Sequence, residues 1–306
     1  SLSYANAHRP WQLYEKVFHG LFKTVAAKAV GKKKFRFKNK LVSLDSTVID
    51  LCLSMYDWAK FRRTKGAVKL HLVLDHDGYL PCFGIITDGK VADVKAAHQM
   101  HFASGTIVVD DRGYNDYRLF AKWTDAGVYF VTRMKDNALY EVVEEHETPK
   151  NRNILRDQTI RLTGTGAQDK CPHLLRRIEA VREDTGDILV FITNHHDLGA
   201  STIAAIYKDR WQIELFFKAL KQNLKIKTFV GTSANAVKTQ IWTALISMLL
   251  LRYLQLSSRF VWSLSNLVAL LRMCLFTHRD LMHWLDHPFA PPLETDEHPQ
   301  ATLAFA

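Results

Sequence analysis

Four residues near the middle of the chain have types and spacing suited to chemistry on charged groups: Tyr207, Arg210, Glu214 and Lys221. At about 100° per residue, one helix over this stretch places all four within an arc of roughly 60°. Glu214 then stands between two cations, beside an apolar flank that faces the core. An ordinary surface helix with Glu paired to Arg or Lys at i,i+4 has the same pattern. The residues alone leave both interpretations open.

The spacing Tyr207-x2-Arg210-x3-Glu214-x6-Lys221 resembles the Tyr-Arg-Glu-Lys signature of the IS-4 family of bacterial insertion-sequence transposases. In that family the glutamate is the last of three metal-binding carboxylates, the DDE triad. The resemblance covers most of the chain. It implies that two aspartates upstream of Glu214 join it at one site.

Asp45 is the first candidate, because it follows the apolar run Leu-Val-Ser-Leu and precedes Ser46. This pattern predicts a buried strand with Asp45 at its carboxyl end. The resemblance gives Asp45 the place of the first triad aspartate. A simple turn cap at Asp45 is the alternative, and Asp50 is a competing candidate that lacks the context of a strand end.

Asp111 is the second candidate, in the sequence Ile-Val-Val-Asp-Asp-Arg-Gly-Tyr from Ile107 to Tyr114. The apolar run again predicts a strand that leads into carboxylates. The Asp-Arg-Gly-Tyr part resembles the family pattern, which assigns the second triad position to Asp111 and leaves Asp110 as a neighbour. The pair of aspartates also fits the N-cap of a helix.

Three converging carboxylates repel one another unless divalent cations join them, so we expect Mg²⁺, with Mn²⁺ as a substitute, and two ions in the site. Asp45 would bridge both ions, with Asp111 and Glu214 each serving one. In such a site one ion activates a water or a 3′-hydroxyl, and the other stabilises the leaving oxygen. The resemblance implies cleavage at insertion-sequence ends followed by strand transfer into target DNA, which is cut-and-paste transposition.

Four side chains are candidates for binding DNA around this site. Arg210 suits a phosphate by bidentate contact, and Lys221 suits one as a point charge. Tyr207 and Trp211 are able to stack on an unpaired base near the break.

The elements that must position these residues alternate between strands and helices, which predicts an α/β layer fold. The resemblance implies a ribonuclease-H-like mixed sheet flanked by helices, with a β-rich insertion before the helix that bears Glu214. Catalytic groups at strand ends are expected in such sheets. We expect four segments: residues 1–138, an N-terminal helix and the first part of the catalytic domain; 139–187, the insertion; 188–287, the rest of the catalytic domain with C-terminal helices; and 288–306, an unstructured tail.

Composition agrees with a protein that acts on DNA in the bacterial cytoplasm, at the nucleoid. The 306 residues carry a formal charge of +10, and basic residues release counterions when they contact phosphates. Residues 32–40 interleave lysines with Phe35 and Phe37, which fits either contact with a DNA backbone or an edge strand protected by lysines. Four cysteines without CxxC spacing favour free thiols in a reducing compartment. The apolar stretch from Ile241 to Leu256 is short for a membrane span, so we expect a core helix.

The expected partner is double-stranded DNA, both transposon ends and target, bound by a dimer and without a membrane. The start of the chain reads as the interior of a longer protein, so we expect an N-terminal region to be missing. Two other functions remain open: a ribonuclease-H-like nuclease without strand transfer, and a truncated remnant that only binds DNA. A purely structural basic protein leaves the Tyr-Arg-Glu-Lys spacing unexplained.

Overall fold

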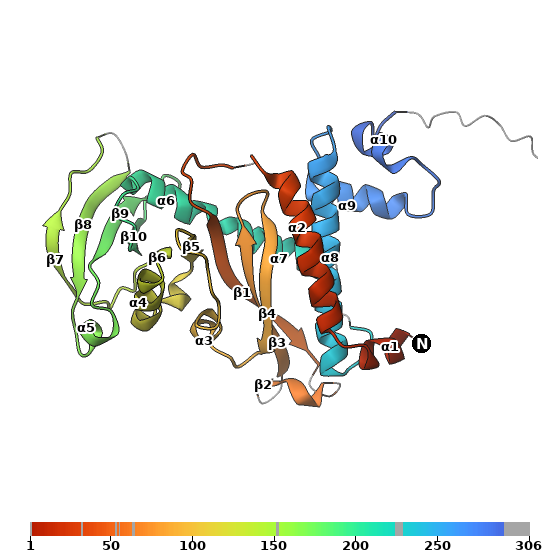
Figure 1. Cartoon of the computed structure of the whole chain (residues 1–306), viewed down its shortest axis with the longest axis horizontal. Coiled ribbons are helices and arrows are strands. Elements are labelled where there is room, and N and C mark those ends of the chain that lie inside the picture. Colours follow the sequence, from red (N-terminus) through yellow and green to blue (C-terminus); the bar gives the residue numbers. More distant parts are fainter. Residues whose placement is uncertain are drawn as a thin grey trace, which may run out of the picture.

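A computed structural model of the chain describes residues 2–31, 33–52, 54, 56–62, 65–150, 153–223 and 229–290. Within these residues, ten strands form one sheet in the order β2-β3-β1-β5-β6-β10-β9-β8-β7, and β4 also pairs with β3. Figure 1 shows this sheet extending across the molecule from β7 to β2. The strands are β1 (Leu41–Leu51), β2 (Lys60–Arg62), β3 (Lys65–Asp75), β4 (Leu80–Asp88), β5 (Ile107–Asp110), β6 (Tyr129–Arg133), β7 (Tyr140–Glu145), β8 (Ile154–Leu162), β9 (Leu175–Val181) and β10 (Ile188–Thr193).

The sheet is mixed, and its pairing changes between parallel and antiparallel at β1 and again at β6. β1 pairs in antiparallel fashion with β3 on one side and in parallel fashion with β5 on the other, and β5 pairs in parallel with β6. The other pairs are antiparallel. The parallel strands are near-continuous apolar runs because helices cover both of their faces. The predicted mixed α/β sheet flanked by helices is confirmed.

The helices pack against the sheet in three hydrophobic clusters. One cluster joins α2, α7 and α8 to β1, β3 and β4. A second joins α3 and α4 to the opposite face of β1 and β5, and a third packs α6 on β5, β6 and β10. The helices are α1 (Leu2–His8), α2 (Gln12–Ala29), α3 (Asp93–Ala97), α4 (Tyr117–Asp125), α5 (Ala167–Lys170), α6 (Ala200–Asp209), α7 (Trp211–Asn223), α8 (Ala234–Ser257), α9 (Leu264–Met273) and α10 (Leu281–Asp286), with short 3₁₀ turns η1 (Asp57–Ala59) and η2 (Arg112–Tyr114).

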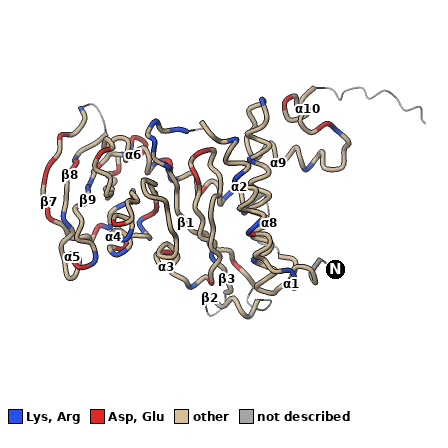
Figure 2. Tube along the Cα trace, in the orientation of Figure 1, with Lys and Arg blue, Asp and Glu red and all other residues tan. Residues whose placement is uncertain are grey.

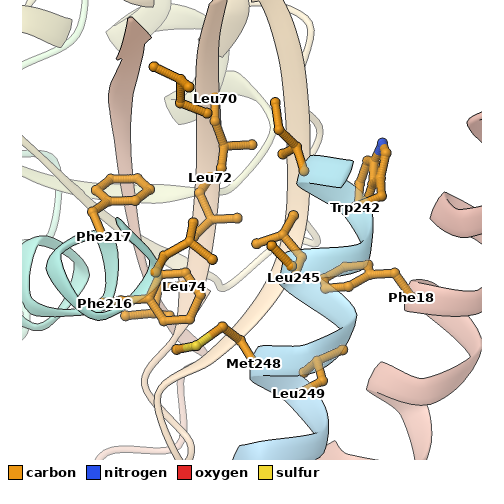
Figure 3. Close-up of a cluster of buried hydrophobic side chains, with 14 of the residues drawn as sticks. Phe18, Leu70, Leu72, Leu74, Phe216, Phe217, Trp242, Leu245, Met248 and Leu249 are labelled. Atoms are coloured by element: carbon orange, nitrogen blue, oxygen red, sulfur yellow. The ribbon is translucent and has the colours of Figure 1, made fainter. Parts of the chain in front are cut away.

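The first cluster holds α7 against the sheet. Figure 3 shows Phe216 and Phe217 of α7 beside the leucines of β3, with side chains of α8 and α2 completing the group. Leu72 and Leu74 of this cluster are fully buried. Burial of this kind contributes roughly 1.5–3 kcal/mol per large apolar side chain. The position of α7 is therefore set by packing along its whole inner face.

Helix α8 is the one helix in the described part of the chain that is long and apolar enough to cross a membrane by length and composition. Half of its apolar window is buried inside the protein, with Trp242 and Leu245 in the first cluster. In Figure 1, α8 lies alongside α2. This packing is that of the core helix predicted from the sequence.

Two predicted features differ from the structure. β1 does not end at Asp45 but continues to Leu51, because its antiparallel ladder with β3 runs on after β5 has ended. Residues 33–39 form no strand, which excludes the edge-strand interpretation for them, and Lys32 lies outside the described residues. In Figure 2 this segment is seen as a basic stretch leading into β1.

The residues expected to form a β-rich insertion contain β7, β8, β9 and the short helix α5. These strands continue the main sheet through the pairing of β9 with β10. The division of the chain into domains stays a prediction. Residues 291–306, most of the expected tail, lie outside the described residues. Cys82, Cys171 and Cys274 are free thiols, as predicted.

Candidate active site

Asp45 lies where the parallel part of the sheet ends. The ladder between β1 and β5 runs from Leu41 to Leu44, which pairs with Asp110, the last residue of β5. Asp45 is the next residue of β1 and Asp111 is the first residue after β5. The two carboxylates therefore leave neighbouring strands at the same level of the sheet.

The face to which Asp45 points follows from its partner on β3. Asp45 pairs with Leu72, and residues directly opposite each other in an antiparallel ladder share a face. Leu72 belongs to the cluster that contains the inner face of α7. Asp45 therefore points toward α7, the helix that carries Glu214 in its first turn.

The same alternation separates Asp110 from Asp111. Val108 packs in the cluster under α4, whereas Val109 packs in the cluster under α6. Asp110 is two residues beyond Val108, so it faces the α4 side, where it is fully buried and burial raises its pKa well above the usual value. Asp111 follows Val109 by two residues and lies on the side of α6, as Asp45 does.

The stretch predicted as one helix over residues 207–221 is two helices that meet at Arg210, so that prediction is wrong. Helix α6 ends at Asp209 and α7 begins at Trp211. Around the junction the hydrogen bonds span three residues, from Arg210 N to Tyr207 O and from Ile213 N to Arg210 O. This tighter turn is a local departure from the regular α-helical pattern on which the predicted arc depends.

Arg210 nevertheless contacts three of the residues that the sequence singled out. Its Nη2 donates a hydrogen bond to Glu214 Oε1 at 2.6 Å, and its Nη1 lies 3.8 Å from Asp45 Oδ2. The guanidinium also lies over the ring of Tyr207, 5.4 Å from its centroid. Arg210 has little solvent exposure, so these contacts are made in a partly desolvated site.

The three predicted triad carboxylates act on one another electrostatically. The pKa of Asp45 is raised to about 6, chiefly by burial and in part by the negative charges of Asp111 and Glu214. The backbone N–H of Ser46 and the charge of Arg210 oppose this rise. The net rise means that Arg210 and the Ser46 N–H do not offset the burial of Asp45 beside two other acids.

A divalent cation is the natural supplement to this donor set, since carboxylate oxygens are the ligands that Mg²⁺ prefers. In the described part of the chain, however, no three His, Cys, Asp or Glu side chains are already arranged around one point as metal ligands. Glu214 is held by Arg210, and the Asp111 side chain accepts a hydrogen bond from Gly113 N. The donors fit the ion in chemical type, since all three are carboxylates.

The other predicted DNA-binding residues are less closely gathered. Trp211 has 56% of its surface exposed and is open to a stacking partner. Tyr207 is half-buried, with its ring 4.9 Å from that of Phe191. Lys221 lies in the last turn of α7, seven residues beyond Glu214. Its role stays a prediction.

Sequence reasoning missed Asp209 and His76, two buried polar residues behind the carboxylates. Asp209 lies inside the Tyr-Arg-Glu-Lys stretch but was not one of its signature residues. His76 lies in the turn between β3 and β4 and was given no role. Their hydrogen bond, 2.7 Å from His76 Nδ1 to Asp209 Oδ2, joins positions 133 residues apart, which no local spacing predicts.

Comparisons with known proteins show which family the chain resembles. A family profile described as "Transposase DDE domain" matches residues 36–250. A protein of Sinorhizobium fredii called "Putative transposase y4zB" is 34% identical over 284 residues, which are 92% of this chain and 78% of that protein. The "Probable transposase for insertion sequence element IS5377" of Geobacillus stearothermophilus is 29% identical over 230 residues, 73% of this chain and 59% of its own length.

A third relative, the "Putative transposase for insertion sequence element IS4SA" of a Synechocystis species, is 23% identical over 255 residues, 80% of this chain and 69% of that protein. Among solved structures, a cryo-EM structure of the piggyBac transposase synaptic complex with hairpin DNA aligns with 83% of this chain and 55% of its own. Its TM-score is 0.44 and its sequence identity 12%.

Proposed function

This chain belongs to the transposase DDE domain family, and from that premise we propose that Asp45, Asp111 and Glu214 are the carboxylates with which it cuts and joins DNA. It is a DNA transposase of the DDE type, related to the transposases of insertion sequences. One observation carries the assignment of the residues: a single guanidinium, that of Arg210, contacts both Asp45 and Glu214, while Asp111 raises the pKa of Asp45.

Enzymes with this domain depend on divalent metal ions. We propose two Mg²⁺ ions, with Mn²⁺ as a substitute, which Asp45, Asp111 and Glu214 would hold. Bound there, the ions supply an activated water or 3′-hydroxyl and a counter-charge for the leaving oxygen. The raised pKa of Asp45 supports this assignment, because a nearby cation would stabilise the ionised carboxylate that burial disfavours.

The chain's own cations and rings position the DNA. Arg210 is placed to exchange its contact with Glu214 for a phosphate oxygen beside the scissile bond, where its planar guanidinium gives bidentate contact. Lys221 would contact a second phosphate further along α7. Trp211, exposed at the start of α7, and the ring of Tyr207 would stack on an unpaired base near the break.

The substrate we propose is double-stranded DNA carrying insertion-sequence ends, which is cut and then joined to target DNA by a dimer of the chain. This would take place at the nucleoid in the bacterial cytoplasm. The formal charge of +10 supports a polyanionic partner. Because the chain spans between 59% and 78% of its curated relatives, the full course of transposition belongs to the proposal rather than to the comparisons.

The experiment is a cleavage and joining assay with DNA that carries the ends flanking the encoding element, in Mg²⁺. Asp45→Asn, Asp111→Asn and Glu214→Gln should each abolish cleavage. Asp50→Asn, an exposed residue on the same strand as Asp45, is the matched control and should retain it. Activity that survives in Asp45→Asn would contradict the assignment. With pre-cleaved ends that carry a 3′-hydroxyl, hydrolysis without joining would indicate a nuclease instead of a transposase.

A further inference from the structure

Ser43, His76 and Asp209 form a buried chain of hydrogen bonds behind the candidate active site. Ser43 Oγ lies 2.6 Å from His76 Nε2, and His76 Nδ1 lies 2.7 Å from Asp209 Oδ2. The exposed fractions of the three residues are 0%, 3% and 2%. They come from β1, from the turn between β3 and β4, and from the last residue of α6.

Asp209 is the acceptor at the centre of this network. Besides the contact with His76, Asp209 accepts hydrogen bonds from Lys34 Nζ at 2.6 Å and from the Tyr79 hydroxyl at 3.1 Å. Although burial acts in the opposite direction, the hydrogen bonds from His76 and Lys34 lower the pKa of Asp209. An ionised Asp209 requires a proton on His76 Nδ1, so in the neutral imidazole Nε2 accepts the hydrogen bond from Ser43.

The order serine, histidine, aspartate is also that of a nucleophilic triad, but here the serine is fully enclosed. Its Oγ has no access to a substrate. A buried and satisfied polar network of this kind makes the surrounding structure rigid and unique instead.

The network connects the two parts of the candidate active site. Ser43 precedes Asp45 by two residues on the same face of β1, and Asp209 is the residue directly before Arg210. We propose that Ser43, His76 and Asp209 are positioning residues that hold Arg210 and Glu214 in register with Asp45. The inference rests on the proposed function, because it assigns the network a role in placing those reacting groups.

The test is Asp209→Asn, which keeps the shape of the side chain and removes its charge. We expect single-turnover cleavage at saturating DNA and Mg²⁺ to fall by about 100-fold, since displacement of a group by about 1 Å has effects of that size. The dissociation constant for DNA should change much less than the rate, because Arg210 is one phosphate contact among several. Asp197→Asn, the same substitution at an exposed residue shortly before α6, is the control and should cleave like the wild type.

A double-mutant cycle separates positioning from general loss of structure. If the network acts through Arg210, Asp209→Asn should add little to the loss already caused by Arg210→Lys. Additive losses, or a DNA affinity that falls together with the rate, would overturn the inference. Should Asp209→Asn fail to fold, Ser43→Ala removes only one oxygen from the network and serves in the same cycle.

A second readout does not depend on activity. The side-chain ¹⁵N signals of Arg210 report its contact with Glu214, and those of His76 report its tautomer. Both should change in Asp209→Asn and stay as in the wild type in Asp197→Asn. Unchanged Arg210 signals would overturn the positioning role even if the wild-type chain cleaved no DNA. An inactive wild type with the expected shifts would instead refute the proposed function alone.

Discussion

Leu44 of β1 pairs with Asp110, the last residue of β5, and this pairing decides which of two consecutive aspartates faces the site. Leu44 packs under α4, so Asp110 opposite it points to that side as well. Asp45 and Asp111 each stand one residue further along their strands. Both therefore point to the opposite face, toward α6 and α7.

The first prediction contrasts the two neighbouring acids. Asp111→Asn should abolish metal-dependent cleavage, whereas Asp110→Asn should leave most of it. Burial raises the pKa of Asp110, so its folded form holds a proton that the unfolded chain gives up above about pH 4. Stability thus falls as pH rises through that range. Asp110→Asn should remove this fall, and urea denaturation at pH 4 and pH 7 measures it. A slope unchanged by the substitution would contradict the account.

The second prediction concerns the pH dependence of Asp45. Its folded pKa is raised from 3.8 to about 6, so without metal its contribution favours the folded state below pH 4 and is lost as pH rises to about 6. The whole change amounts to at most about 3 kcal/mol. Added Mg²⁺ should reverse the trend, because the ionised carboxylate binds the cation. Thermal unfolding with and without Mg²⁺, from pH 4 to pH 7, checks both signs. Asp45→Asn should remove the Asp45 part of the slope from both curves and leave the part due to Asp110.

The third prediction concerns Arg210. Arg210→Lys keeps the positive charge but removes the guanidinium, whose two terminal nitrogens contact Glu214 and Asp45. The rate of cleavage should therefore fall by about 100-fold. Arg210→Ala also removes a charge that lowers the pKa of Asp45, so that pKa should rise above about 6. Carboxyl ¹³C shifts across a pH titration measure it. A pKa that stays the same would mean that Arg210 does not act on Asp45.

Much of the candidate site could be predicted because its signals are local. The spacing from Tyr207 to Lys221 and the apolar runs before Asp45 and Asp111 each lie within a few consecutive residues. The mixed sheet likewise follows from the order of apolar runs and turns. These features depend on periodicity and on short-range geometry, which the sequence displays directly.

What could not be predicted depends on partners distant in the sequence. β1 continues past Asp45 because β3 pairs with it up to Leu51. The residues around Asp45 do not predict this pairing. The junction at Arg210 falls within a stretch whose residues all suit a helix. The link from His76 to Asp209 spans 133 residues. Tertiary context decided each of these, and it overrides local propensity.

The fourth prediction tests how α7 is held against the sheet. Leu72→Ala should lower the free energy of unfolding by about 2–5 kcal/mol, because Leu72 of β3 is fully buried in the cluster that also contains the aromatic residues of α7. Leu215→Ala makes the same truncation on the exposed side of α7 and should change stability by about 0.5 kcal/mol or less. Urea denaturation compares the two. Equal effects would show that α7 is not anchored through Leu72.

The fifth prediction assigns a DNA contact to Trp211. Its side chain is 56% exposed at the first position of α7, directly after Arg210, so a base unpaired near the break is within its reach. Trp211→Ala should weaken binding of DNA with unpaired bases at the cleavage point by about 1–3 kcal/mol, the usual value of one stacking contact. Affinity for fully paired DNA should change little, and so should the thermal midpoint. Fluorescence anisotropy with the two DNAs measures the difference. Equal weakening for both would indicate that Trp211 contacts the backbone instead of a base.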